Sequence, residues 1–366
     1  MMIWVSQLNC RKMADYKRLG DYIVAVDERN SDLSITLSQG INNNKYFQQP
    51  RQVAENSKND KIVRHGYFAY NRATTRNGDK ISIAYREGED CTVSSAYQVF
   101  YIKDEELLNP HYLLLWFKRP TFDRYARFKS HGSAHEFFEW EEMCNVMLPV
   151  PPIEEQRHIV EQYQTVERRI KNKERLIALL EDTAQTIFRH RFVENIDPNN
   201  LPEGWRMGTL GEIADFSYGK LPSKEENGDV PVFSGYAVVG MTNVEMFNEQ
   251  HIVVIARGDS GSGKIVLSPH RFFLTNLAIS INLHDNAYMH YLYQHLLSAD
   301  TYSLRSGSAQ AQVTINDLAK FEVMIPSNKE VEAFQTLVLS LYRYKETIEK
   351  ENNLLNSTKE ALICKL

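Results

Sequence analysis

The second half of this chain repeats the first, and this duplication constrains the fold more than any other feature of the sequence. Gly132-Ser133-Ala134 recurs as Gly307-Ser308-Ala309, 175 positions later, and Val150-Pro151 recurs as Ile325-Pro326 at the same offset. A repeat of this length exceeds the roughly 20–50 residues of solenoid repeats, so the repeated piece is a whole domain with its own tail. The copies match better in their tails than in their heads. A shared scaffold that carries two different surfaces is therefore expected.

Each copy ends in a long predicted helix with a narrow apolar stripe. The stripe follows Pro151 and Pro152, which close the first globular segment because proline is not tolerated in a helix interior. Its positions step by three and four residues: Ile159, Tyr163, Val166, Ile170, Ile177, Leu180, Ala184 and Ile187, then Phe334, Val338, Leu341, Ile348, Leu355 and Leu362. Such narrow seams predict an antiparallel coiled coil between the two helices. Lys173, Lys345, Asn352 and Lys359 interrupt the seams and are expected to fix their register.

These signals predict an α+β fold in four segments. The expected segments are a globular domain at 1–152, a spacer helix at 153–195, a second globular domain at 196–326 and a second spacer helix at 327–366. Within the globular domains, β-rich runs such as Ile252–Ala256 and Ile279–Leu283 alternate with helical patterns such as Ala287–Leu297. We expect two mixed α/β domains related by a pseudo-twofold internal repeat.

Composition and charge narrow the class of protein. No apolar run approaches the roughly 18 residues of a membrane span, and the start lacks a secretion signal, so we expect a cytoplasmic protein without a membrane partner. The four cysteines are scattered, which favours free thiols over structural zinc. The net charge is −5, with +1 on residues 1–150 and −5 on residues 201–326. A chain this acidic is expected to need partners before it binds nucleic acid tightly.

Catalytic motifs are incomplete. Gly258–Lys264 fits the phosphate-binding pattern GxxxxGK, but Ile265 stands where that motif needs Ser or Thr to hold Mg²⁺. The same stretch is similar to the nucleophile loop of trypsin-like proteases, yet the His, Asp and secretory context are missing. An adenosylmethionine loop, an Asn-Pro-Pro-Tyr-type tetrapeptide and a nuclease carboxylate cluster are also missing. We therefore predict a protein that is not an enzyme, with no catalytic, cofactor or metal site of its own.

Basic loops are the candidate binding residues. A glycine-rich turn joins Arg257 to Ile265, and the stretch from Arg72 to Lys80 is its counterpart in the first copy. Trp116–His131 interleaves cations with aromatic residues, a pattern that can hold a phosphate backbone. The predicted DNA contacts are Arg72, Arg76, Lys80, Arg124, Arg127, Lys129, Arg257, Ser262, Lys264, Ser308 and Gln310. Other interpretations are hairpins with solvated charges, an amphipathic helix with its aromatic face in the core, and packing turns at the Gly-Ser-Ala loops.

Three segments carry a resemblance to a known family. They are the helix start Leu148–Val160, which contains Pro-Pro-x-Glu-Glu-Gln, the run Leu201–Trp205 leading to Leu210–Ile213, and the loop Arg257–Ile265. In this order they resemble the specificity subunits of type I restriction–modification systems over essentially the whole chain. The second copy departs from the pattern, because it keeps one proline and has Val331 where the first has Gln156.

The resemblance implies a non-catalytic reader of double-stranded DNA. Each globular domain would be a target-recognition domain for one half of a bipartite target, and the helices would set the spacing and dock two modification (methyltransferase) subunits. S-adenosylmethionine, ATP and Mg²⁺ would then belong to the partners, which include restriction subunits that translocate and cut DNA. Two alternatives are a coiled-coil scaffold that binds no nucleic acid, and a DNA methyltransferase or nuclease with duplicated recognition domains. The missing catalytic motifs count against the second alternative.

Overall fold

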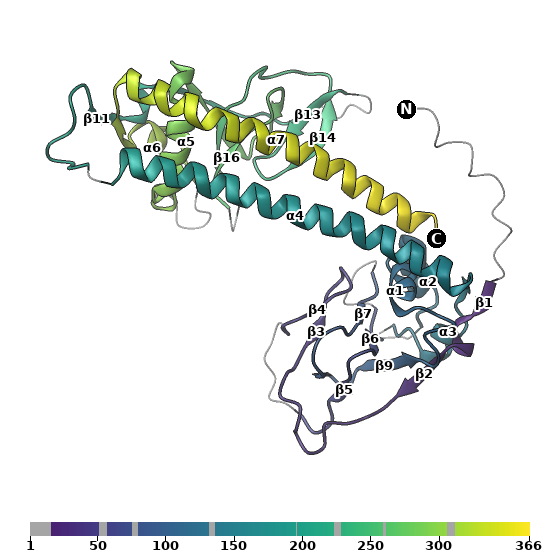
Figure 1. The fold of residues 1–366 in the computed structure, drawn as a ribbon. Coiled ribbons are helices and arrows are strands. Elements are labelled where there is room, and N and C mark those ends of the chain that lie inside the picture. The colour runs from purple at the N-terminus through teal and green to yellow at the C-terminus, as the bar shows by residue number, and fades with distance from the viewer. Residues whose placement is uncertain are drawn as a thin grey trace. The chain divides into compact units, whose positions relative to one another are not determined.

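Two long helices run through both halves of the structure. The computed structural model describes residues 16–50, 57–74, 80–131, 136–194, 196–222, 228–258, 261–305 and 312–366. The chain divides into unit 1, Met1–Asn172 with Asn352–Leu366, and unit 2, Lys173–Glu351. Helices α4 (Ile153–Phe192) and α7 (Asn328–Cys364) each contribute residues to both units (Figure 1). No helix in the described residues combines the length and the apolar character that a membrane crossing requires.

The globular part of unit 1 folds around an antiparallel sheet. Its elements are β1 (Tyr16–Arg18), the 3-10 helix η1 (Leu19–Asp21), β2 (Ile23–Val26), β3 (Gly40–Ile41), β4 (Phe47–Gln48), β5 (Lys61–Val63), β6 (Phe68–Asn71), β7 (Ile83–Tyr85), β8 (Cys91–Val93), β9 (Tyr97–Ile102), α1 (Pro110–Phe117), α2 (Pro120–Phe128), α3 (Trp140–Cys144) and β10 (Met147–Pro149). The main sheet has the order β2-β9-β6-β7, with β3-β4, β5-β8 and β1-β10 as separate pairs. Phe68 and Phe100 stack on paired strands, and Phe117 of α1 meets Phe68 edge-on, so α1 covers this sheet.

Unit 2 repeats this plan. Its elements are β11 (Arg206–Thr209), η2 (Leu210–Glu212), β12 (Ala214–Tyr218), β13 (Val230–Phe233), β14 (Val238–Thr242), β15 (Ile252–Ile255), β16 (Ile265–Leu267), β17 (Phe273–Leu274), β18 (Ala278–Leu283), η3 (Asn286–Tyr288), α5 (Met289–Ser298), η4 (Thr301–Leu304), α6 (Ile315–Ala319) and β19 (Glu322–Ile325). The main sheet has the order β12-β18-β15-β16, which matches β2-β9-β6-β7 position by position, and β11-β19 matches β1-β10. The sequence repeat is thus a repeat of fold. The units differ beside the main sheet, where unit 2 has a sheet β14-β13-β17 and unit 1 has short pairs.

The two long helices pack antiparallel, as the seams predict. In unit 2, Lys345 Nζ of α7 lies 2.6 Å from Glu181 Oε1 of α4, and Lys173 of α4 pairs with Glu351 of α7. As the residue numbers increase along α4, the numbers of the partner residues on α7 decrease, so the two helices run antiparallel. Two of the predicted seam interruptions are therefore ion pairs between the helices.

The predicted seam is wrong at the C-terminal end of α4. The sequence pattern placed Ile187 in the seam, but Phe188 and Phe192 are the buried residues, each 1% exposed. Phe192 meets Tyr291 of α5 and Phe334 of α7 edge-on, with ring centroids 4.8 and 5.2 Å away. The last turns of α4 belong to the core of unit 2, so the buried face rotates away from a pure helix–helix seam.

Candidate nucleic-acid interface

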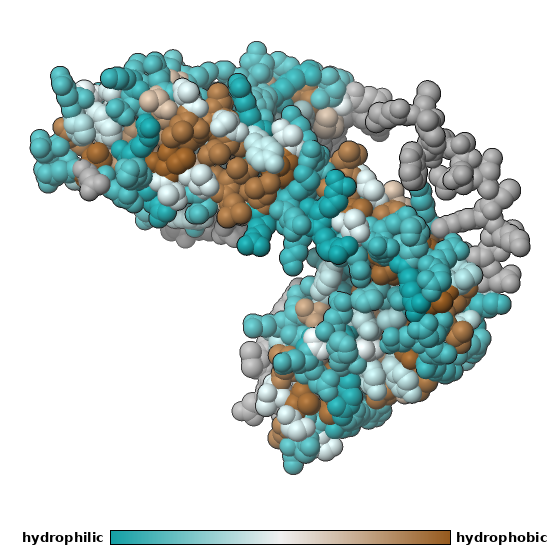
Figure 2. Space-filling view, viewed as in Figure 1, coloured by the Kyte–Doolittle hydropathy of each residue, from teal (hydrophilic) through white to brown (hydrophobic). Residues whose placement is uncertain are grey.

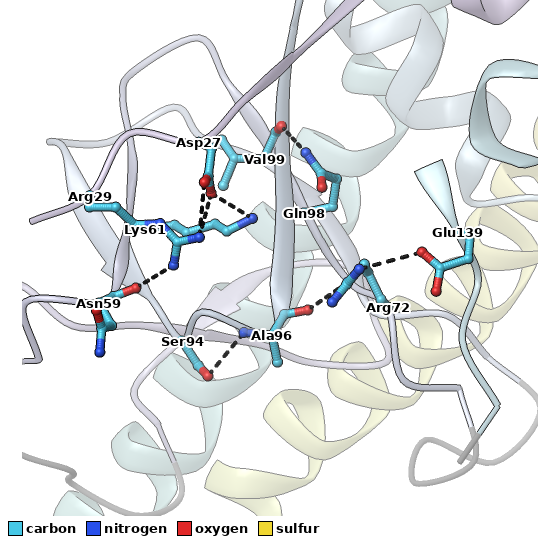
Figure 3. Close-up of polar contacts among 10 residues, drawn as sticks. All are labelled: Asp27, Arg29, Asn59, Lys61, Arg72, Ser94, Ala96, Gln98, Val99 and Glu139. Atoms are coloured by element: carbon cyan, nitrogen blue, oxygen red, sulfur yellow. Dashed lines mark hydrogen bonds and ion pairs between the residues drawn. The ribbon is translucent and has the colours of Figure 1, made fainter. Parts of the chain in front are cut away.

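In unit 1, three strand ends meet at one edge of the main sheet. β2 ends at Val26 opposite Val99, and β6 ends at Asn71 opposite Tyr97, the first residue of β9. The residues that continue each strand, among them Arg72, therefore gather at this edge although they are far apart in sequence (Figure 3). A cluster of polar side chains at a strand edge can reach base edges or phosphates.

Asp27 organises the first group of cations at this edge. Its Oδ1 atom lies 2.7 Å from Arg29 Nη2 and 3.0 Å from Lys61 Nζ, and Arg29 Nη1 donates to the Asn59 carbonyl at 2.7 Å (Figure 3). Hydrogen bonds from Arg29 and then Lys61 lower the pKa of the Asp27 carboxyl, so it is ionised at neutral pH. Two cations share one carboxylate, which leaves a net charge of +1; Lys61 is buried, and the Arg29 side chain is partly exposed.

Arg72 forms the second group. Its Nε donates to the Ala96 carbonyl at 3.4 Å, its Nη1 lies 3.4 Å from Glu139 Oε2, and its guanidinium lies 5.8 Å from the centre of the Phe137 ring. Both polar contacts are at the long limit for hydrogen bonds, so the guanidinium can exchange them for a ligand at little cost. Gln98, in the middle of this edge, donates to the carbonyl of the next residue, Val99, at 2.9 Å.

In unit 2, the loop that joins β15 to β16 holds two of the predicted residues on its surface. Arg257 and Lys264 are exposed, and Arg257 Nε donates to Gln312 Oε1 at 3.1 Å. Within the described residues no carboxylate forms an ion pair with either cation. The turn needs its glycines: Gly263 has φ +90°, and a Cβ on Gly261 would lie 1.9 Å from the Tyr236 hydroxyl. The glycines thus let Tyr236 lie directly against the loop backbone.

The two loops are equivalent, but their arginines are shifted by one residue. Phe138 N donates to the Arg72 carbonyl at 2.9 Å, and Val313 N, 175 positions later in the chain, donates to the Ala256 carbonyl at 3.0 Å. Arg72 therefore corresponds to Ala256 and not to Arg257. Because the arginines stand at positions that are not equivalent, the two units present them differently.

The structure places Ser262 inside the protein. Ser262 is 1% exposed, and its carbonyl accepts from Arg305 Nε at 2.7 Å. The Arg305 guanidinium lies 4.4 Å from the centre of the Tyr302 ring. Sequence reasoning missed Arg305, although it stands just before the predicted Ser308 and is one of few cations in this acidic domain. It likewise missed Arg29, Lys61 and Gln98, which no single-sequence pattern distinguishes.

The basic aromatic stretch of unit 1 is an amphipathic helical segment, as one of the two interpretations held. Trp116, Phe117 and Phe122 are buried in the core, whereas Arg124 and Arg127 are exposed. Two cations of the stretch are paired: Arg127 with Glu136, and Lys129 with Glu142 at 3.3 Å. Arg124 and Lys80 are exposed and form no ion pair with described residues. Together with Arg127 they line one hollow of unit 1.

Some predicted contacts lie outside the described residues. These are Arg76, Ser308 and Gln310, with both Gly-Ser-Ala loops. Of the cysteines that the structure describes, Cys91 is buried, Cys144 is half-buried and Cys364 is exposed, and all three are free thiols.

Comparison with known proteins identifies relatives over most of the chain. The family described as "Type I restriction modification DNA specificity domain" matches twice, at residues 26–182 and 202–359, one match in each half of the repeat. The chain is 25% identical over 293 residues to the Type I restriction enzyme MjaIX specificity subunit of Methanocaldococcus jannaschii, covering 70% of this chain and 67% of that protein. Its fold is similar to the crystal structure of the type I restriction–modification S subunit from M. genitalium, with a TM-score of 0.64, 15% identity and 97% of both chains covered.

Proposed function

This chain belongs to the family of type I restriction–modification DNA specificity domains, and from this premise we propose that each of its units reads one half of a two-part DNA target. The chain is the DNA target specificity subunit of such a system and a non-catalytic component of it. We assign the target-recognition domains to residues 1–152 and 196–326, and the spacer helices to residues 153–195 and 327–366. S-adenosylmethionine, ATP and Mg²⁺ are assigned to the partner subunits.

In unit 1, the reading surface is the edge formed by the ends of β2 and β6 and the start of β9. The observation that supports it most is the state of Arg72, a half-exposed guanidinium whose two polar contacts are both 3.4 Å long. A guanidinium can bond both acceptors on the major-groove edge of guanine, and the amide of the nearby Gln98 suits adenine. The Asp27–Arg29–Lys61 group adds a net positive charge for a phosphate beside them.

In unit 2, the reading surface is the β15–β16 loop with the neighbouring β14 strand. Arg257 and Lys264 supply exposed cations without a described ion pair, and the glycines fix the loop backbone by letting it pack against Tyr236 and Thr301. Val238, Val239 and Met241 of β14 are 50%, 61% and 45% exposed, which is unusual for three such residues in one strand. Apolar side chains of this kind can contact the methyl group of thymine. The two units would therefore read different bases with different chemistry.

The long helices are the proposed docking surface for the methyltransferase subunits. Figure 2 shows apolar surface over the region of α4, α5 and α7 in unit 2. On these helices in unit 2, Leu179 of α4 is 53% exposed, and Leu337 and Tyr344 of α7 are 45% and 51% exposed. Large apolar residues exposed along a helix pair whose inner face is already packed favour burial by a partner chain.

Reconstitution tests this function. The purified chain is combined with and without its methyltransferase subunits, and binding and methylation are measured on duplexes from the host genome. We expect weak binding and no methyl transfer by the chain alone, because its net charge of −5 repels DNA at long range. Tight, sequence-specific binding should appear with the partner. Robust methyl transfer without any partner, or a complex that binds all duplexes equally, would contradict the proposal.

A further inference from the structure

Unit 1 contains a basic pocket that the DNA-reading surfaces do not explain. The pocket has a volume of about 960 Å³ and lies among the β3–β4 hairpin, α2, α4 and the last turns of α7, all within unit 1. A hollow of this size accommodates a drug-sized ligand. Its described lining has six cations, Lys45, Lys80, Lys118, Arg124, Arg127 and Lys359, against one carboxylate, Asp123.

Only two of these six cations form an ion pair with a described carboxylate. Lys45 pairs with Asp123 at 2.6 Å, and Arg127 pairs with Glu136. Among the residues that the structure describes, no carboxylate lies within ion-pair distance of the other four cations of the pocket. Burial lowers the pKa of Lys118, and the negative charge of Glu167, which accepts from the Tyr46 hydroxyl at 3.1 Å, partly offsets this effect. Such an excess of positive charge in a chain of net charge −5 favours an anionic occupant.

The floor of the pocket is fixed in advance. Lys45 is 4% exposed, and its ammonium donates to Asp123 Oδ1 at 2.6 Å and to the Ile81 carbonyl at 3.2 Å. Asp123 Oδ1 also accepts from Ile81 N at 3.2 Å. Lys45 has φ +67°, a left-handed conformation that costs a residue with a side chain roughly 1–2 kcal/mol. Backbone strain of this kind is concentrated at functional sites.

Aromatic rings complete the pocket. Lys118 Nζ donates to the Tyr46 hydroxyl at 3.0 Å and lies 4.7 Å from the centre of that ring. Tyr163, on the inner wall, lies 5.2 Å from the same ammonium. Phe128 is 79% exposed at the rim, next to Arg124 and one turn away from it on α2. An exposed ring beside cations offers a face on which a flat heterocycle can stack.

We propose that this pocket is a nucleotide-binding site, in which Lys118, Arg124 and Lys359 hold the phosphate and Tyr46 and Phe128 flank the base. Two sources share this chemistry. One is a free nucleotide, and the other is a nucleotide of bound DNA, a source that rests on the proposed DNA-reading function. The pocket is separate from the sheet-edge residues assigned to base reading, so the two proposals can fail independently.

Titration calorimetry of the full chain tests the site with AMP, inorganic pyrophosphate and adenosine as probes. AMP should bind, and adenosine should bind at least tenfold more weakly because it lacks the phosphate. Arg124→Glu and Lys359→Glu should each weaken AMP binding roughly ten- to a hundredfold, the loss expected for a hydrogen bond to a charged group. Neither residue has an ion pair in the described chain, so thermal melting should be unchanged. Arg169→Glu is the matched control, because Arg169 is exposed on α4 outside the pocket.

A second measurement separates the two sources. Acetylation of Lys118 and Lys359 is followed by mass spectrometry in the presence of AMP or of a short duplex that lacks the target. Protection by AMP identifies free nucleotide, and protection by the duplex alone, lost in Arg124→Glu, identifies DNA. The proposal is overturned if neither probe binds or protects, or if Arg169→Glu weakens binding as much as the pocket variants. If these tests are negative but Arg257→Ala still loses target selectivity, the nucleotide-site proposal is refuted and the DNA-reading proposal is supported.

Discussion

Arg257 is the residue whose removal most sharply tests how unit 2 reads DNA. Its side chain is exposed, and its described polar contact is one hydrogen bond to Gln312 at 3.1 Å. Loss of such a bond changes the free energy of unfolding by about 0.5–1.5 kcal/mol at most, so Arg257→Ala should fold normally. If the guanidinium contacts a base, the variant should lose about 1–3 kcal/mol of binding free energy at one base pair, a factor of roughly 5–150.

The assay measures binding of the assembled complex to duplexes in which each target position is changed in turn, at several salt concentrations. A base contact of Arg257 gives relaxed selectivity at one position in one half of the target. A phosphate contact instead weakens binding to every duplex equally and reduces the salt dependence by about one ion. Lys264→Ala, in the same loop, should follow one of these two patterns. Lys320→Ala removes an exposed cation of unit 2 outside the loop and should leave binding within twofold of the unchanged chain.

Two results would refute the reasoning. Normal folding with unchanged binding of both loop variants would show that the β15–β16 loop does not touch DNA. Altered selectivity in both halves of the target after a change in unit 2 alone would show that recognition is a joint property of the two units.

Three further predictions follow from the helices and the buried histidines. Removing seven residues around Leu179–Thr183, with seven from the facing part of α7, shortens the helix pair by about 10 Å. Methylation sequencing should then show a target with a changed spacer length and unchanged half-sites. New bases within a half-site would contradict a spacing role for the helices. Ile348→Asp places a charge at a position 1% exposed and should abolish assembly with the methyltransferase, while Leu354→Asp, at a position 69% exposed, should leave helix content by circular dichroism intact. Burial lowers the pKa of His290 and His295 below 6.5, so their contribution to stability is full above that pH and is lost as the pH falls through the lowered pKa values. The protection factors of the α5 amides, which are hydrogen-exchange rates corrected for the intrinsic pH dependence of exchange, should therefore fall from pH 7 to pH 5, and unchanged protection factors would count against this.

The repeat and the long helices could be predicted because their signals are local and periodic. The heptad spacing placed a helix from Ile153, where α4 begins, and the β-rich run Ile252–Ala256 forms β15. The helical pattern from Ala287 forms η3 and then α5, which begins at Met289. Strand order was beyond such reasoning, because pairing in these sheets joins residues that no local pattern connects.

The end of the seam shows where local periodicity fails. A heptad pattern assumes that the facing surface is another helix throughout. Near Phe188 and Phe192 the facing surface includes Tyr291 of α5, so the buried positions follow the shape of the unit 2 core. The same two residues were visible in the sequence as apolar, but their partner was not.

The predicted cations illustrate a second limit. Arg72, Arg127 and Lys129 each face a carboxylate of one short segment, Glu136, Glu139 or Glu142. These acidic residues are spaced three apart, a pattern that by itself indicates solvent-exposed charges. The pairing of Arg72 with Glu139 spans 67 positions and exists only in the folded chain. Charge counts by segment therefore overstate the cations that are free to bind DNA in unit 1.

Because many cations of unit 1 are paired with carboxylates, the two units differ in where their unpaired charge lies. Segment counts made residues 1–150 weakly basic, but in unit 1 four cations without a described ion pair line a single pocket: Lys80, Lys118, Arg124 and Lys359. The second globular domain has few cations, with 8 Lys and Arg in residues 201–326, and much of the exposed surface of its β14 strand is apolar. Contacts with phosphates weaken steeply with salt, whereas apolar contacts with bases do not. If both surfaces contact DNA as proposed, two copies of one fold would supply different kinds of binding free energy, because the similar tails of the repeat carry heads with different surfaces.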